Sequence, residues 1–539
     1  MNRPAIKVTP SIYAAICLAA MGLLRWQNLW QRGILEHDEG HALLNANTWR
    51  HIILWVLRGG PLQADENSIA ALRDTLHREG GTLYSAGKFG YSLLLAVAGL
   101  PGDVTVRLGL TLAWLCGLAV CCLAGVATWQ YSKNMLSAAI VVIMCVVSPV
   151  LQTLSREVSG TIWALMFGLA GLVLMQSSIG RSGTSSRLRS AAGGLCLGYG
   201  FLCHFNIAPF ILGAFGAAGC MAAQEFARPL RLRAALVALW PAAASSLFIL
   251  ALAEAATQVV DYRLRHVFPE YRSVFDELIH LVRRDQVPML SGVLYGDGVI
   301  GWGREAWAYY GHIFLWKESG FVLMVLAVPY FAHRAPGTWK KLLAPGVLFV
   351  IPLVFYALYV YRVERVFGML ITSGWIIIGV AIGEDLTRHY LPTSPAHRRF
   401  SRAMVLVILS IVAASLSLVR LGLGDMRSPM PSLVRDTLAY ISRHGGRVTA
   451  GSFDASFAPL WKWTIVEEAR NEPYRPARNY IDFSTFANPE IVFTDPRSWV
   501  RDDGPAFPVS REEVADSFII AKYTRTMPNW SLSSADLRY

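Results

Sequence analysis

Charge is scarce in this sequence. Only 16% of its 539 residues are Asp, Glu, Lys or Arg, whereas 54% are hydrophobic, and a soluble domain usually carries about 25% charged residues. This shortage excludes an ordinary soluble domain and predicts a polytopic α-helical membrane protein. The formal net charge of +12 does not predict a nucleic-acid partner, because Lys and Arg gather in the cytoplasmic loops of membrane proteins.

The signatures of several common chemistries are also missing. The eight cysteines lie in or beside apolar segments, with no CxxC pair and no disulfide framework, so we interpret them as small core residues. The sequence has no P-loop, no dinucleotide fingerprint and no pattern of a catalytic triad. It also lacks the internal repeat of interrupted helices that is typical of many transporters.

Apolar runs set the expected topology. If all of them crossed the membrane, the basic loop 181–189 would lie outside, against the positive-inside bias. The run 89–100 is well below the roughly 20 residues that an upright spanning helix needs, so we expect a juxtamembrane or re-entrant helix on the outer side. About eleven spans remain, the first retained with the N-terminus inside. The runs are 11–30, 89–100, 104–128, 135–151, 159–176, 190–203, 207–223, 234–254, 319–333, 344–361, 366–383 and 403–421.

This topology gathers the polar loop residues on the outer face. The spans themselves are largely free of charge, whereas ionisable residues beside spans are costly and tend to be functional. We therefore expect an extracytoplasmic active site in a transmembrane catalytic domain, 1–423. The outer segments are the first loop 31–103, a short loop 152–158, a tight turn 204–206, the large loop 255–318 and a short loop 362–365.

The C-terminal region, 424–539, changes character. It is polar and contains three strand-like runs, Arg447–Ala450, Ile491–Thr494 and Ser517–Lys522, with a helical stretch, Pro431–His444, before them. This pattern predicts a small extracytoplasmic α/β domain.

Two acids stand between two histidines just after the first apolar run. A carboxylate pair at the membrane interface, Asp38 and Glu39, suits a general base or a metal ligand, and a solvated acidic loop is the alternative. His37 and His41 are four residues apart, which on a helix puts both on one face. With Asp38 or Glu39 they could hold Zn²⁺ or Mn²⁺, or they are hydrogen-bonded structural histidines. We do not expect a required metal.

The outer motifs, in this order, resemble those of the C-type glycosyltransferase superfamily, and within it the protein mannosyltransferase and lipid A aminoarabinose transferase group. One departure is Phe89-Gly90, where the family often has a Pro pair after the lysine, and another is Val366-Phe367 after Arg365. The matching stretches are His37–His41, Tyr84–Leu93, Ser148–Glu157, Gly200–Asn206 and Tyr361–Phe367.

This resemblance implies an enzyme that transfers a sugar from a polyprenyl-phosphate carrier to an acceptor hydroxyl on the outer face of the membrane. In that reading Asp38 is the base and Glu39 assists it. Lys88 and Arg365 neutralise the departing phosphate. Arg362 is the alternative candidate for the role of Arg365.

Three further residues are candidates for the site. Arg156 and Glu157 stand where the family has its second short outer loop, and a structural ion pair is the alternative. His204 stands at the tight outer turn. A divalent cation near Asp38, Glu39 and His41 stays open.

Other functions remain in view. A lipid-linked sugar transporter or flippase would need polar residues through its spans, and a non-catalytic scaffold would only bind the lipid carrier. An enzyme that transfers a whole oligosaccharide is a third alternative. The acceptor, whether glycan, lipid or protein, does not follow from the sequence. The compact polytopic arrangement without disulfides is typical of a bacterial inner membrane protein with a periplasmic site. A protein of the endoplasmic reticulum with a lumenal site would have the same sequence features.

Overall fold

The structure is a computed structural model in which the helical part of the chain is described most fully. It describes the single positions 29, 70 and 72, the helical part 37–58, 88–102, 104–181, 183–225, 231–264, 273–281, 312–335, 337–358 and 367–390, and the strands 448–451, 479–482, 490–494 and 520–524.

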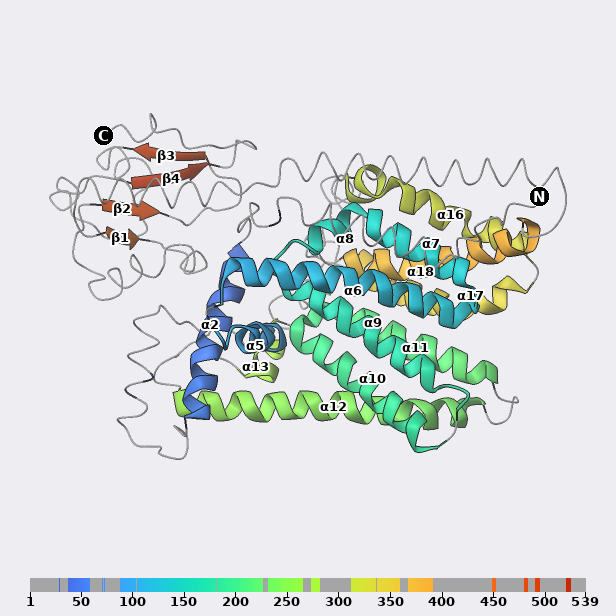
Figure 1. Cartoon of the computed structure of the whole chain (residues 1–539), viewed down its shortest axis with the longest axis horizontal. Helices are drawn as coiled ribbons and strands as arrows, with labels where there is room; N and C mark the ends of the chain where they lie inside the picture. The colour runs from blue at the N-terminus through green and yellow to red at the C-terminus, as the bar shows by residue number, and fades with distance from the viewer. Residues whose placement is uncertain are drawn as a thin grey trace, which may run out of the picture.

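Helices dominate the described part of the chain (Figure 1). In chain order they are α2 (His37–Leu57), α5 (Phe89–Ala98), α6 (Val106–Ser132), α7 (Met135–Val147), α8 (Pro149–Leu154), α9 (Gly160–Ser178), α10 (Thr184–Cys203), the short 3₁₀ turn η2 (Phe205–Ile207), α11 (Ala208–Glu225), α12 (Arg231–Leu264), α13 (Val274–Leu281), the π-helical turn η5 (His312–Lys317), α16 (Ser319–Arg334), α17 (Thr338–Leu358) and α18 (Phe367–Tyr390).

Six of these helices are long and apolar enough to cross a membrane: α6, α9, α11, α12, α17 and α18. Three shorter apolar helices, α5, α7 and α16, accompany them. The expectation of a polytopic α-helical membrane protein is confirmed. The expected count of about eleven spans stays a prediction, because the apolar runs 11–30 and 403–421 lie outside the described residues.

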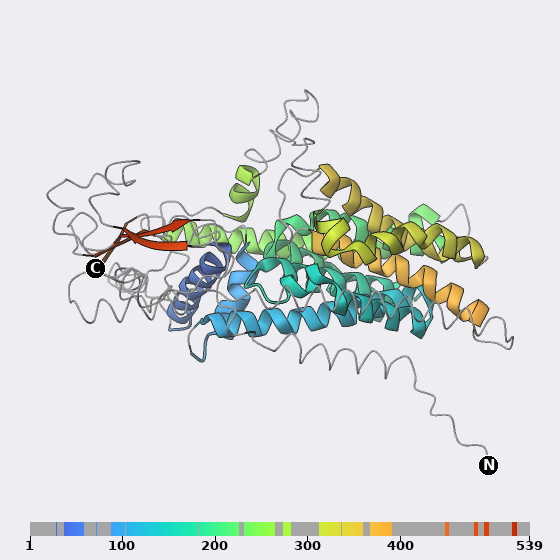
Figure 2. The ribbon, with the colours of Figure 1, turned by 90° about the horizontal axis from the view of Figure 1, so that it is seen from above.

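The long helices run together along the long axis of the molecule, and α2 lies across one end of them (Figures 1 and 2). Helix α18 is the central helix, since nearly all of its spanning window is buried. Helix α12 is peripheral and exposes Leu236, Trp240 and Leu247. Apolar side chains on the outside of such a bundle are suited to lipid.

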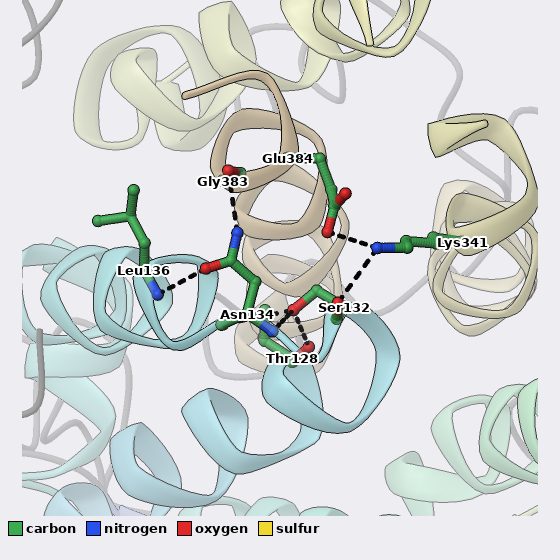
Figure 3. A network of polar contacts seen from close by, with 7 residues as sticks. All are labelled: Thr128, Ser132, Asn134, Leu136, Lys341, Gly383 and Glu384. Atoms are coloured by element: carbon green, nitrogen blue, oxygen red, sulfur yellow. Dashed lines mark hydrogen bonds and ion pairs between the residues drawn. The ribbon is translucent and has the colours of Figure 1, made fainter. Parts of the chain in front are cut away.

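The end opposite α2 is fastened by polar contacts between four helices (Figure 3). Lys341 of α17 forms an ion pair of 2.7 Å with Glu384 of α18 and donates to the carbonyl oxygen of Ser132 in α6. Asn134 caps α7 through the amide of Leu136 and donates to the carbonyl oxygen of Gly383. The basic loop before α17 therefore lies at the same end as the α6–α7 turn, as the predicted topology requires.

Two features differ from the sequence-based expectation. The run 135–151 is not one span, because the helix stops at Val147 and restarts as α8, with Pro149 in its first turn. Proline lacks an N–H and fits the first turn of a helix but not its interior. The first outer loop, 31–103, contains the 21-residue helix α2, so Asp38 and Glu39 belong to a helix and not to an acidic loop.

A four-stranded mixed sheet lies in the C-terminal region. Its strands are β1 (Val448–Gly451), β2 (Asn479–Asp482), β3 (Glu490–Thr494) and β4 (Ile520–Thr524), in the order β1-β2-β4-β3. The pairs β1–β2 and β2–β4 are parallel, and β3–β4 is antiparallel. Three strands overlap the predicted runs, and β2 was not predicted. The expected helix Pro431–His444 lies outside the described residues, and the domain boundary at 424 stays a prediction.

Replacing Lys341 by Met will lower the free energy of unfolding by about 1 kcal/mol, since it leaves the mostly buried Glu384 carboxylate without its cation. The effect is modest because the Lys341 side chain is 40% exposed. The measurement is the thermal unfolding midpoint of the protein in detergent. Lys340→Met is the matched control at an exposed neighbouring position, and equal midpoints for both variants would contradict the role of the pair.

Candidate functional site

The end of the bundle that α2 crosses holds the described candidate residues. Helix α2 begins at His37, so Asp38 and Glu39 lie in its first turn, and His37 and His41 belong to the same helix. Acidic residues are favoured there because the helix N-terminus carries partial positive charge. The side chains of these four residues are outside the described part, so their roles stay predictions.

Lys88 directly precedes α5 and is half-buried. Two contacts of the residues that follow Lys88 fix the start of α5. The rings of Trp49 in α2 and Phe89 meet edge to face with centroids 5.1 Å apart. Tyr199 of α10 donates a 2.8 Å hydrogen bond to the carbonyl oxygen of Gly90. A Cβ atom at Gly90 would lie 2.9 Å from the Cβ of Leu202. The Phe89-Gly90 pair, which departs from the family pattern, therefore lets α5 approach α10 closely.

Arg156 and Glu157 form the turn that follows α8. Their side chains are only 1% and 5% exposed, and the Arg156 amide donates to the carbonyl oxygen of Thr153 at 2.9 Å. Burying ionised groups is costly unless the protein compensates them. The short outer loop predicted at 152–158 is thus a packed turn and not a solvated loop.

His204 ends α10 beside that turn. Its Nδ1 accepts a hydrogen bond from the amide of Asn206 at 3.3 Å, and its ring is 4% exposed. The turn predicted at 204–206 is present as η2. A Cβ atom at Gly160 would clash with the carbonyl oxygen of Cys203, so the start of α9, shortly after Glu157, meets the end of α10. The fold therefore brings the Arg156 turn and the His204 turn together.

The segment that holds Arg362 and Arg365 lies outside the described residues, but the helices on both sides of it are fixed at the same end. Tyr356, near the end of α17, donates a 2.6 Å hydrogen bond to the carbonyl oxygen of Asn206. At the start of α18, a Cβ atom at Gly368 would clash with Leu154 of α8. The end of α17 therefore lies beside η2, and the start of α18 lies beside α8.

Sequence reasoning missed Glu318. This residue precedes α16 and is 3% exposed. It accepts hydrogen bonds from the hydroxyl of Ser148 at 2.5 Å and from the amide of Val150 at 3.0 Å. The available signal was a single acid directly before the apolar run 319–333, at the end of a predicted outer loop, where ionisable residues are costly.

No group of three His, Cys, Asp or Glu side chains that could hold a metal occurs among the described residues. The candidate ligands Asp38, Glu39 and His41 lie in the part of α2 whose side chains are not described. A divalent cation at that place therefore stays a prediction.

No protein-family model and no curated protein matches the sequence. Solved structures do match. The apo crystal structure of the Archaeoglobus fulgidus oligosaccharyltransferase has a TM-score of 0.50 at 10% identity, over 86% of this chain and 64% of that chain. The Cupriavidus metallidurans ArnT structures, apo and bound to undecaprenyl phosphate, have TM-scores of 0.46 and 0.47 at 13% identity. They cover 91% and 92% of this chain and 94% and 96% of those chains.

The helical bundle thus shares its fold with the Archaeoglobus fulgidus oligosaccharyltransferase, in agreement with the fold expected from the outer motifs. The chain spans just under two thirds of the length of the archaeal oligosaccharyltransferase. At such low identity the likeness concerns the fold and carries no substrate with it.

Replacing Gly160 by Ala will destabilise the protein by about 1–3 kcal/mol, because the new methyl group overpacks the contact between α9 and α10. The measurement is again the thermal unfolding midpoint in detergent. Gly102→Ala is the control, since a Cβ atom there meets nothing within 4 Å. If the two variants unfold at the same temperature, the close approach of α9 to Cys203 is wrong.

Proposed function

We propose that this protein is a membrane glycosyltransferase that transfers a sugar from a polyprenyl-phosphate donor to an acceptor on the extracytoplasmic face. The observation that carries the proposal is where the polar motifs lie. In a bundle with a C-type glycosyltransferase fold, the first turn of α2, Lys88, the Arg156 turn and the start of α18 lie at one end. A donor held in lipid presents its phosphate at such an interface.

The reaction is a substitution at the anomeric carbon of the donor. Asp38 accepts the proton of the acceptor hydroxyl as its oxygen bonds to that carbon, and Glu39 orients Asp38 or the acceptor. The bond between the anomeric carbon and the phosphate oxygen breaks, and the electron pair leaves with the polyprenyl phosphate. Attack from the face opposite the phosphate inverts the configuration of the sugar.

The leaving phosphate gains negative charge, which fixed cations stabilise in a site with little water. Lys88 supplies a point charge, and Arg365 supplies a planar pair of hydrogen-bond donors. Arg362 is the alternative candidate for the role of Arg365. Arg156 and Glu157 support these groups from the adjacent buried turn. His37 and His41 would hold a divalent cation with Asp38 or Glu39 if the enzyme uses one.

The remaining assignments follow the sequence. The catalytic domain is 1–423, in a bacterial inner membrane, and the domain 424–539 lies in the periplasm. The acceptor is a glycan, a lipid or a protein. The charge-poor spans disfavour a flippase, because such a protein needs a polar pathway through its helices.

Replacing Asp38 by Asn will lower the rate of sugar transfer at least about 100-fold, because a carboxamide cannot accept the acceptor's proton. The measurement is transfer of radiolabelled sugar from synthetic polyprenyl-phosphate donors to membrane extracts, with a diphosphate-linked oligosaccharide donor as a parallel arm. Asp276→Asn, an exposed position in α13, is the control and should transfer normally. Wild-type rates in Asp38→Asn would refute the mechanism.

Replacing Lys88 by Met will reduce turnover about 100- to 1,000-fold, since it removes one cation from the developing phosphate charge. Lys133→Met is the matched control, because Lys133 caps the end of α6 at the opposite end of the bundle. The same assay measures both variants. Equal turnover in the two would show that Lys88 does not act on the phosphate.

A further inference from the structure

The break between α7 and α8 has a buried carboxylate at its centre. Ser148, the residue at the break, is 1% exposed, and Glu318 is 3% exposed. One oxygen of Glu318, Oε1, accepts both the Ser148 hydroxyl at 2.5 Å and the Val150 amide at 3.0 Å. The first amides of a helix have no partner within it, so Glu318 satisfies a donor of α8 that no water would reach.

Helix α8 in turn carries the Arg156 turn of the candidate site. Its last turn continues directly into Arg156 and Glu157, whose amides donate to the carbonyl oxygens of Thr153 and Leu154. Its Leu154 packs against Gly368 in the first turn of α18, three residues after Arg365. A shift of α8 would therefore move the Arg156 turn and the start of α18 together.

Glu318 also ends the large outer loop expected at 255–318. Its amide donates to the carbonyl oxygen of Ile313 at 2.9 Å in η5, and its own carbonyl oxygen accepts the Val322 amide of α16. The carboxylate that holds α8 is thus itself held by η5 and α16. These contacts join parts of the chain about 170 residues apart.

We infer that Glu318 is a positioning residue of the site: it fixes α8, and through α8 it places the Arg156 turn and the start of α18. The predicted effect of Glu318 on sugar transfer rests on the function proposed above, whereas its hydrogen bonds to the start of α8 do not depend on that function. Glu318 acts on α8 through hydrogen-bond acceptance by Oε1.

This role predicts an unusual order of effects among substitutions of Glu318. In Glu318→Gln the amide oxygen can accept both hydrogen bonds, so α8 stays in place. In Glu318→Asp the charge remains, but the side chain is one methylene too short to reach Ser148 and Val150. A carboxylate that touched the substrate or a cation would rank the two in the opposite order.

The first measurement is hydrogen exchange of the α8 amides, read by mass spectrometry on the full-length protein in detergent. We expect exchange to be about tenfold faster or more in Glu318→Ala and Glu318→Asp, and unchanged in Glu318→Gln. Glu254→Ala is the matched control, because the Glu254 carboxylate accepts from the Phe275 amide of α13 in the same way and should not affect α8. If Glu318→Ala fails to fold, the Asp and Gln variants still decide the question.

The second measurement is sugar transfer by the same variants. Turnover should fall about tenfold or more in Glu318→Asp and stay within about twofold of wild type in Glu318→Gln, because small displacements of positioned groups cost rate. Unchanged α8 exchange in both Ala and Asp variants, or a Gln variant as slow as the Ala variant, overturns the inference. If the wild type transfers no sugar from any donor, the proposed function fails, while the exchange result still tests the hold on α8.

Discussion

A helix that breaks inside a membrane protein leaves backbone N–H groups that no lipid can satisfy. The break at Ser148 imposes this constraint on the end of the bundle that α2 crosses. The Ser148 hydroxyl caps Leu151, Gln152 donates back to the carbonyl oxygen of Val146, and Glu318 accepts from Val150. These partners come from both sides of the break and from the start of α16, so α8 is held at its first turn by three parts of the chain.

The two ends of the bundle differ in how far their basic side chains are buried. At the end shown in Figure 3, Lys341 pairs with Glu384 and remains partly exposed, and Arg334 pairs with Asp385 at 3.4 Å. The two carboxylates are buried, at 0% for Asp385 and 9% for Glu384, and each is compensated by a cation that stays partly exposed. At the other end Arg156 is almost wholly buried. Replacing a buried ion pair by apolar residues is often neutral or stabilising, so stability alone is a weak reason for an arginine there, which agrees with the supporting role proposed above for Arg156.

The sequence was sufficient for features that depend on local pattern. Apolar runs predicted the spanning helices, and the turn at His204 followed from a short polar gap between two runs. Helix α2 was missed because its core-facing positions include Asn45, Asn47 and Thr48, which are buried in the structure but read as loop in the sequence.

Glu318 was missed for a different reason. Its partners at Ser148 and Val150 are about 170 residues away, and no local pattern encodes such a contact. The break at Ser148 could have been predicted from Pro149, but its partner could not. Long-range polar contacts of this kind are set by tertiary packing, so the outline of the site was predictable and its support was not.

The helical state of α2 also bears on the proposed chemistry. A carboxylate in the first turn of a helix is stabilised in its ionised form by the helix dipole. In the mechanism proposed above, the ionised form of Asp38 is the one that accepts the proton of the acceptor hydroxyl. The same proposed mechanism needs cations that stabilise the charge on the leaving phosphate, so the placement of Lys88 at the start of α5 is a second demand on this end of the bundle.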